Sequence, residues 1–378
     1  MKKLLIGFVI IVVMALAIVL IVTQTRKEEK EIKIGVILPL TGSNAVDGEA
    51  AKQSIDLAFE LKRAEFIKKG ITLRFIYEDD KMIPNEGVNA ATKIIKIDKV
   101  IAIIGPFGSS VLFAVAPVAE QNRVVLISGS ATNPKIKEAG DYIFRDVPPD
   151  DYQGKALSKF AYEVLKVKKA AILYMNNDYG VGLKNVVERE FPQLGGQIIY
   201  SEAFNPGETD FRSHLQKLRK TNPECAFLPS HHTEGALILR QAREIGIKIP
   251  FLGGDGIFRP ELIDIASNAA NNTYISSMSW RPDSDDPLVK EFVVKFKEKY
   301  VKEPNVFSAY YFDATNIILD AILNGAKTSD EIKSYLYQNE FMGVTGKTKF
   351  DRYGEVEKPI DIFKIENKKF QYVYTVKP

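Results

Sequence analysis

The sequence IGPFGSSVLFAVAPVAEQNRVVLISGSATNP, residues 104–134, determines how the rest of the chain is interpreted. Two apolar runs, Val100–Ile104 and Val124–Ile127, are each followed by glycine and hydroxyl residues. The segment between them has apolar residues at helical spacing. This order predicts strand, loop, helix, strand and loop, the unit of an open parallel sheet. Ligands of such sheets bind beyond the carboxyl ends of strands, so we expect Ser109 and Thr132 to hold a small polar ligand.

The same alternation continues on both sides of this stretch. Before it, strands are expected at 32–38 and 73–77, with helices following each. A polar, proline-containing turn at 146–151 interrupts the pattern. Beyond the turn the alternation restarts, with strands expected at 170–174, 197–200, 226–228 and 249–252 and helices at 152–165, 183–191, 211–219 and 233–245. Repeated alternation of this kind predicts two doubly wound α/β domains.

The last hundred residues change character. A further strand is expected at 272–278, followed by helices at 287–300, 307–323 and 329–338. Three tail segments then show strand-like alternation and are separated by glycine or asparagine turns: 347–350, 359–364 and 370–376. Such segments predict antiparallel strands.

Composition excludes several classes of protein. The length of 378 residues favours two domains, and 46% apolar with 26% charged residues is ordinary for a globular chain. The net charge of +3 is small, with both signs mixed along the chain, so no basic stripe for nucleic acid is present. The single cysteine, Cys225, permits no intrachain disulfide, and its apolar neighbours predict a buried strand thiol.

The first residues form a separate segment. Lys2 and Lys3 precede Leu4–Val22, a run without charged or amide residues that is close to the length of a membrane-spanning helix. Lysines before the run place the amino end inside and the rest of the chain outside the cytoplasm. We favour an uncleaved anchor, with a cleaved signal peptide as the alternative. Both interpretations predict an extracytoplasmic protein, anchored to the membrane or secreted.

The runs IKIGVILPLTG, LISGSATNP, NNDYGVGL, LRQAREIGI and FLGGDGI occur in this order. In these motifs the chain resembles the substrate-binding proteins of branched-chain amino acid ABC transporters. The resemblance implies the type I periplasmic binding fold, in which two doubly wound α/β lobes are joined by a three-strand hinge. It further implies an anchor or signal at 1–31, one lobe from 32–150 plus 278–341, and a second lobe from 151–277 plus 342–378.

The resemblance also implies residues for one end of an amino acid ligand. The serine that holds the ligand carboxylate in the family corresponds to Ser109. The alanine and threonine of the ATNP loop correspond to Ala131 and Thr132, with backbone groups of Ser130 contributing. This assignment agrees with the chemistry, because hydroxyls, loop amides and the positive amino end of a helix all suit a carboxylate.

The other end of the ligand is implied to lie against the second lobe. The tyrosine of the YGVG loop is Tyr179, and the acidic residue that pairs with the ligand ammonium is Asp255. A buried ammonium needs such a charge-assisted partner. Where the family has aromatic residues at the side-chain end, this chain has Asp47 and the pair His231 and His232. On an extended segment we expect one histidine, taken as His231, to line the cleft and the other to face outward.

The sequence lacks the motifs of several other chemistries. Ser109, a histidine and Asp255 could form a hydrolase triad, but no G-x-S-x-G turn surrounds any serine. Neither a phosphate-binding loop nor a complete dinucleotide fingerprint follows the first strand, and adjacent histidines cannot easily ligate one metal ion. We therefore expect no cofactor, no metal site, no nucleic-acid partner and no catalysis.

The sequence thus predicts a binding protein that captures an amino acid, branched-chain or otherwise aliphatic, and delivers it to the permease of an ABC importer. The alternative is a binding protein or sensor for another small solute, such as an amide, a urea-like compound or an aromatic acid. A hydrolase is the less favoured third class.

Overall fold

The first sheet has five parallel strands in the order β2-β1-β3-β4-β5. The structure is a computed structural model and describes residues 31–377. The strands are β1 Ile32–Leu38, β2 Leu73–Asp79, β3 Ala102–Ile104, β4 Val125–Ser128 and β5 Ile143–Arg145. Strands β3, β4 and β5 are buried along their whole length. Burial on both faces is typical of a parallel sheet covered by helices on each side.

Helices cover the two faces of this sheet. One face packs against α2, α11 and α12, and the other packs against α3 and α4. In β1, Ile34 and Val36 enter the first of these cores and Ile37 enters the second, because successive side chains of a strand alternate. The helices are α2 Ala45–Lys68, α3 Pro84–Lys93, α4 Ser109–Gln121, α11 Val306–Leu323 and α12 Ser329–Gln338. Within residues 31–377, α11 alone is long and apolar enough to cross a membrane, but 83% of its apolar window is buried, as in a core helix.

The second sheet is mixed, with the order β14-β13-β10-β9-β8-β6-β7. The five strands from β10 to β7 run parallel, whereas β13 and β14 are antiparallel to their neighbours. This confirms the antiparallel strands expected at 359–364 and 370–376. The strands are β6 Lys169–Met175, β7 Gln197–Phe204, β8 Cys225–Leu228, β9 Phe251–Gly253, β10 Thr273–Met278, β13 Ile360–Glu366 and β14 Lys369–Val376.

The remaining predicted tail strand, at 347–350, takes a different form. Its first two residues, Lys347 and Thr348, lie in β12, Gly346–Thr348, which forms a short antiparallel hairpin with β11, Phe341–Gly343. The backbone amides of Val344 and Thr345 donate to the carboxylate of Asp313 in α11, at 2.9 and 2.7 Å. These bonds attach the hairpin to the first lobe and leave it outside both large sheets.

Helices also pack on both faces of the second sheet. They are α5 Asp150–Lys159, α6 Asp178–Gln193, α7 Arg212–Lys220, α8 His232–Glu244 and α9 Pro260–Ala266. Helix α9 was not predicted. Cys225 is fully buried in β8, and burial raises the pKa of its thiol, which confirms the buried strand thiol expected from sequence.

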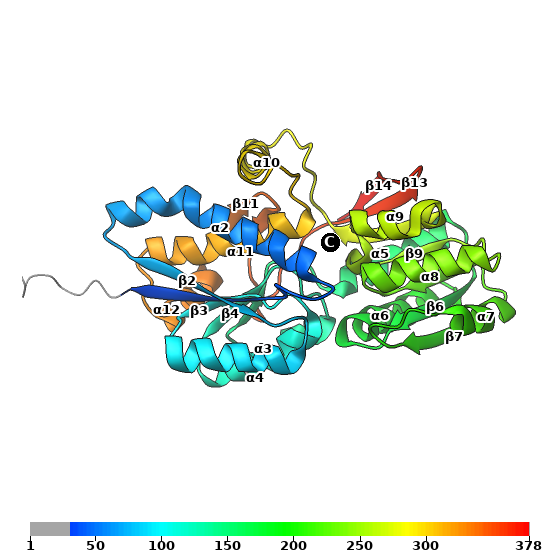
Figure 1. Cartoon of the computed structure of the whole chain (residues 1–378), viewed down its shortest axis with the longest axis horizontal. Helices are drawn as coiled ribbons and strands as arrows, with labels where there is room; N and C mark the ends of the chain where they lie inside the picture. Colours follow the sequence, from blue (N-terminus) through cyan, green and yellow to red (C-terminus); the bar gives the residue numbers. More distant parts are fainter. Residues whose placement is uncertain (1–30, 378) are drawn as a thin grey trace, which may run out of the picture.

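The chain crosses between the two sheets three times. The crossings lie between β5 and α5, between β10 and α10 (Pro287–Tyr300), and between β12 and β13. The result is two α/β lobes with the crossing segments between them (Figure 1). Helix α10 returns to the first lobe, where it packs against α2. The expected membrane segment Leu4–Val22 lies outside the described residues.

A buried ion pair joins two of the crossing segments. Asp146 follows β5, and Lys358 precedes β13 by two residues. The Lys358 ammonium donates to Asp146 Oδ1 at 2.7 Å and to Thr345 Oγ1 at 2.7 Å, and both charged side chains are at most 1% exposed. The Thr348 hydroxyl also donates to Asp146 Oδ1, at 2.7 Å. This buried network holds together the crossing segments that follow β5 and precede β13.

Candidate functional site

A pocket lies between the lobes, lined by residues of both. Its lining from the first lobe is Asn44, Asp47, Met82, Phe107, Gly108, Ser109, Ser130 and Phe307, and from the second lobe Tyr179, His231, Asp255, Gly256 and Arg259. The cavity volume is about 40 Å³. The pocket adjoins a larger hollow of about 530 Å³ at the mouth of the cleft. Ser109, Tyr179 and His231 line both.

Most of these residues lie just beyond the carboxyl ends of parallel strands. Strand β3 leads to Ser109, β4 to Ser130, β6 to Tyr179, β8 to His231 and β9 to Asp255. The carboxyl ends of strands from both sheets therefore face the same pocket. This is the usual position for a site in open α/β sheets.

Five of the seven residues predicted for the site line this pocket, and the other two lie beside it. Ala131 and Thr132 are each 1% exposed and do not line the cavity. The Ala131 amide donates to Ser128 Oγ at 3.1 Å, and the Thr132 carbonyl accepts from the Asp150 amide at 2.8 Å. In this arrangement both residues support the pocket wall, and their contact with a ligand stays a prediction.

The first lobe places the amino end of a helix at the pocket. Ser109 is the first residue of α4, and its Oγ accepts from the Asn133 amide at 3.3 Å. The amino end of this helix is positively polarised, and its first amides have no partner within the helix. Gly105 begins the loop that leads from β3 to this helix. Its φ is +103° and a Cβ there would lie 2.1 Å from the Ile37 carbonyl oxygen, so glycine allows the loop to pack closely against β1.

Ser130 is held in place by hydrogen bonds within the first lobe. Its hydroxyl donates to the Phe107 carbonyl at 2.8 Å and lies 2.9 Å from the Tyr311 hydroxyl. Its backbone amide donates to Ser128 Oγ at 3.3 Å. Contact of its backbone with a ligand therefore stays a prediction.

The second lobe provides a buried carboxylate. Asp255 is 2% exposed, and its Oδ1 accepts from Tyr179 Oη at 2.9 Å and from Gln153 Nε2 at 3.0 Å. Tyr179 is held in turn by the Gly256 amide, which donates to its hydroxyl at 3.0 Å. Burial raises the pKa of Asp255, and these hydrogen bonds oppose that rise. A cation placed beside Asp255 would stabilise its ionised form.

A second buried carboxylate lies behind the first. Gln153 Nε2 also donates to Asp150 Oδ1, at 2.9 Å, so one amide group contacts both carboxylates. Burial raises the pKa of Asp150 well above its usual value, and the nearby charge of Asp255 raises it further. Two carboxylates sharing one amide make this end of the pocket favourable for a cation.

The two histidines take different positions. The His231 ring stacks on Tyr179 with centroids 5.6 Å apart and lines the pocket, as expected. His232 begins α8 and is 4% exposed, so the expectation that it faces outward is wrong. The physical reason is that the segment starts a helix here and does not continue as a strand. Burial lowers the pKa of both rings, which favours neutral imidazoles.

An ion pair crosses the pocket between the lobes. Arg259, just before α9 in the second lobe, donates from Nε to Oδ1 of Asp47, in the first turn of α2 in the first lobe. Both side chains are 3% exposed. The Arg259 guanidinium also lies over the Phe307 ring, 3.9 Å from its centroid. Asp47 thus pairs with an arginine at the position where the family resemblance implies an aromatic residue.

Further contacts hold the lobes together at the rim. The Asp178 amide, at the start of α6, donates to Ser110 Oγ in α4 at 3.1 Å. The Asn133 side chain donates to the Asp178 carbonyl. Together with the Asp47–Arg259 pair, these bonds define a closed cleft.

Comparison with known proteins agrees with this geometry. The family model described as periplasmic binding protein matches residues 31–369. The chain belongs to this family. The Leu/Ile/Val-binding protein homolog 2 of Brucella abortus (strain 2308) is 31% identical over 330 residues, covering 86% of this chain and 87% of that protein.

Two solved structures have the same fold as this binding protein. The leucine binding protein LivK from Thermotoga maritima MSB8 aligns with a TM-score of 0.87 and 32% identity, over 92% of this chain and 99% of that one. The branched-chain amino acid transporter substrate binding protein LivJ from Streptococcus pneumoniae, solved in complex with isoleucine, aligns with a TM-score of 0.86 and 31% identity. That alignment covers 92% of this chain and 100% of the other.

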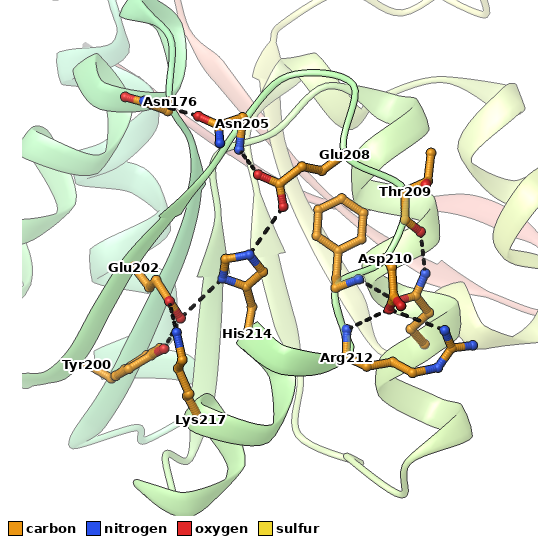
Figure 2. Close-up of polar contacts among 12 residues, drawn as sticks. Asn176, Tyr200, Glu202, Asn205, Glu208, Thr209, Asp210, Arg212, His214 and Lys217 are labelled. Atoms are coloured by element: carbon orange, nitrogen blue, oxygen red, sulfur yellow. Dashed lines mark hydrogen bonds and ion pairs between the residues drawn. The ribbon is translucent and has the colours of Figure 1, made fainter.

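A second group of charged side chains lies on the outer part of the second lobe. Figure 2 shows His214 between Glu202 and Glu208, with its two ring nitrogens each 3.2 Å from a carboxylate oxygen. Lys217 Nζ is 2.6 Å from Glu202 Oε1. Glu208 also accepts from the Asn205 amide, so the cluster anchors the 205–210 loop at the cleft mouth. Within residues 31–377, no group of three His, Cys, Asp or Glu residues is placed to hold a metal ion.

Among the residues that sequence reasoning missed, Gln153, Arg259 and Phe307 make contacts that shape the pocket. No local motif marks them, because each acts through a partner far along the chain. Gln153 contacts Asp255 across 102 positions, and Arg259 reaches Asp47 across 212.

We expect Gln153→Leu to lower the free energy of unfolding by about 3 kcal/mol, because two buried carboxylates lose a shared donor. Gln153 Oε1 also accepts from the Asp255 amide at 3.1 Å and from Ser276 Oγ at 3.2 Å, so the backbone of the site loses a bond as well. Urea denaturation followed by circular dichroism measures the change. Gln216→Leu, at an exposed position of α7, is the matched control and should change stability little. Equal losses of stability in Gln153→Leu and Gln216→Leu would contradict the role of Gln153 as a donor to both carboxylates.

Proposed function

We propose that this protein is an extracytoplasmic solute-binding protein that captures an amino acid, branched-chain or otherwise aliphatic, between its lobes. The observation that carries this proposal is the opposition of two complementary ends in one pocket. Ser109 and the amino end of α4 face it from the first lobe, and Asp255 with Tyr179 faces it from the second.

The two ends match the two charges of a zwitterion. The ligand carboxylate would accept from the Ser109 hydroxyl and the first amides of α4. The ligand ammonium would donate to Asp255, whose burial makes a positive partner favourable. Because the two ends belong to different lobes, a ligand that satisfies both stabilises the closed form over the open one.

The names of the relatives support the choice of ligand. Both solved structures and the Brucella relative are named for leucine, isoleucine, valine or branched-chain amino acids. We propose on this basis that the captured amino acid is delivered to the permease of an ABC importer. From the apolar run Leu4–Val22 we propose that the amino-terminal segment attaches the protein to the membrane. We propose no catalysis, since Ser109 and Asp255 approach from opposite lobes and no base contacts the serine hydroxyl among the described residues.

Isothermal titration against the twenty amino acids tests this function. We expect one or several small uncharged amino acids to bind, with valine, isoleucine and leucine tested first. Failure of every amino acid to bind, or preferential binding of a benzoate or urea-like compound, would remove the proposal. Incubation with amide and ester substrates should show no turnover. Mass spectrometry of the mature amino terminus distinguishes an anchor from a cleaved signal.

A further inference from the structure

The ion pair between Asp47 and Arg259 lies where no charge is needed to hold the two ends of a zwitterion. Both residues line the same pocket as Ser109 and Asp255. They come from opposite lobes, and both side chains are almost completely buried. A buried ion pair is weak evidence for stability alone, because desolvation offsets much of the attraction. A role in the choice of ligand is therefore worth testing.

The pair is fixed in position and balanced in charge. Arg259 donates from Nη1 to the Phe258 carbonyl at 2.8 Å, and its guanidinium lies over Phe307. Arg259 Nη1 also lies 3.5 Å from the Asp255 carbonyl oxygen, and the Arg259 charge lowers the pKa of the Asp255 carboxyl, so Asp255 is a second charge near Arg259. A ligand group entering beside them meets a negative and a positive charge that already neutralise each other.

We infer that Asp47 and Arg259 together determine that the side chain of the bound amino acid is uncharged. The inference rests on the proposed function and names the two residues of the same pocket that exclude charged side chains. An acidic ligand side chain would be repelled by Asp47 and could reach Arg259 only by breaking the pair. A basic ligand side chain would be repelled by Arg259 and could reach Asp47 only by breaking the pair. Rejection by like charge and by unpaired buried charge is an effective source of specificity.

The inference predicts that substitutions of the two residues change the preference for charged ligands in opposite directions. Asp47→Asn removes the carboxylate that is hydrogen-bonded to the buried Arg259 guanidinium, so an acidic amino acid should gain affinity. Arg259→Gln leaves Asp47 as an unpaired buried anion, so a basic amino acid should gain affinity. A merely structural role would weaken all ligands in both variants and would not depend on the sign of the ligand charge.

The experiment measures affinities for glutamine, glutamate, methionine and lysine by calorimetry in the wild type, D47N, R259Q and the double variant. Glutamine with glutamate and methionine with lysine are pairs of similar length that differ in charge. In the wild type, the uncharged member of each pair should bind more tightly. We expect D47N to raise the affinity for glutamate relative to that for glutamine by at least about tenfold. We expect R259Q to raise the affinity for lysine relative to that for methionine by a similar factor. The double variant should prefer neither charge.

Arg123→Gln and Asp330→Asn are the matched controls. Arg123 and Asp330 form an ion pair of the same two residue types, at 3.0 Å, but it is exposed and lies within the first lobe. Neither control variant should change any of the four affinities. Thermal melts establish that every variant is folded.

Several results would overturn the inference. One is a wild type that binds glutamate as well as glutamine, or lysine as well as methionine, and this result needs no variant to fold. Another is an equal loss of all ligands in D47N and R259Q without a change in either ratio. Absence of any amino acid binding to the wild type would instead remove the proposed function, and the inference with it.

Discussion

Asp255→Asn is expected to weaken binding of the amino acid ligand by at least about 100-fold, because it removes the one charge that would pair with the ligand ammonium. The carboxylate is buried, and Gln153 and Tyr179 hold its Oδ1 at 3.0 and 2.9 Å. The amide keeps the shape of the side chain and can still accept a hydrogen bond. The expected loss of affinity is therefore due to the missing charge and not to a change in the shape of the pocket.

The same variant has a ligand-side control. A carboxylic acid that has the ligand's side chain but lacks its ammonium should lose little affinity in the variant, since it never uses Asp255. Calorimetry by competition measures both affinities. Equal losses for the amino acid and the carboxylic acid would show that Asp255 does not hold the ammonium.

The pH dependence of binding gives a second readout of Asp255. Because burial raises the pKa of this carboxyl, protons compete with the ligand ammonium at a higher pH than for an ordinary aspartate. Wild-type affinity should thus fall as the pH is lowered towards that raised pKa, and the asparagine variant should lose this dependence. A wild-type affinity that does not change on acidification would contradict the assignment.

Lys358→Met is expected to lower the free energy of unfolding by about 3–5 kcal/mol, because it leaves Asp146 as an unpaired buried charge. Burial already raises the pKa of Asp146, and Lys358 opposes that rise. Asp313 lies close enough to add repulsion, and its own pKa is raised to about 6, by burial first and by Asp146 second. Removing the only ammonium hydrogen-bonded to Asp146 in the described chain leaves two carboxyl groups near each other without a counter-charge.

The double variant D146N/K358M should recover most of the lost stability, since it removes both charges together. Urea denaturation measures all three proteins. Lys290→Met is the matched control, because the Lys290–Asp285 pair has a similar distance of 2.8 Å but is exposed, and exposed pairs contribute at most about 1 kcal/mol. A loss no larger in Lys358→Met than in Lys290→Met would contradict a structural role for the hinge pair.

The sequence by itself determined the local pattern of the chain. Apolar runs such as Ile32–Leu38 and Val124–Ile127 predict buried strands, and the residues that follow them predict loops at one edge of a sheet. Because ligands bind beyond the carboxyl ends of parallel strands, the sequence pattern indicates Ser109 as a pocket residue, and the family resemblance implies Tyr179 and Asp255.

The tertiary structure alone decided which distant side chains are partners. The Asp47–Arg259 and Asp146–Lys358 pairs each join residues 212 positions apart, and Gln153 links two carboxylates 105 positions apart. It also decided that His232 is buried. The physical reason is that periodicity and turn chemistry act over a few residues, whereas a buried charge is stabilised by whichever partner the folded lobes bring within hydrogen-bonding distance.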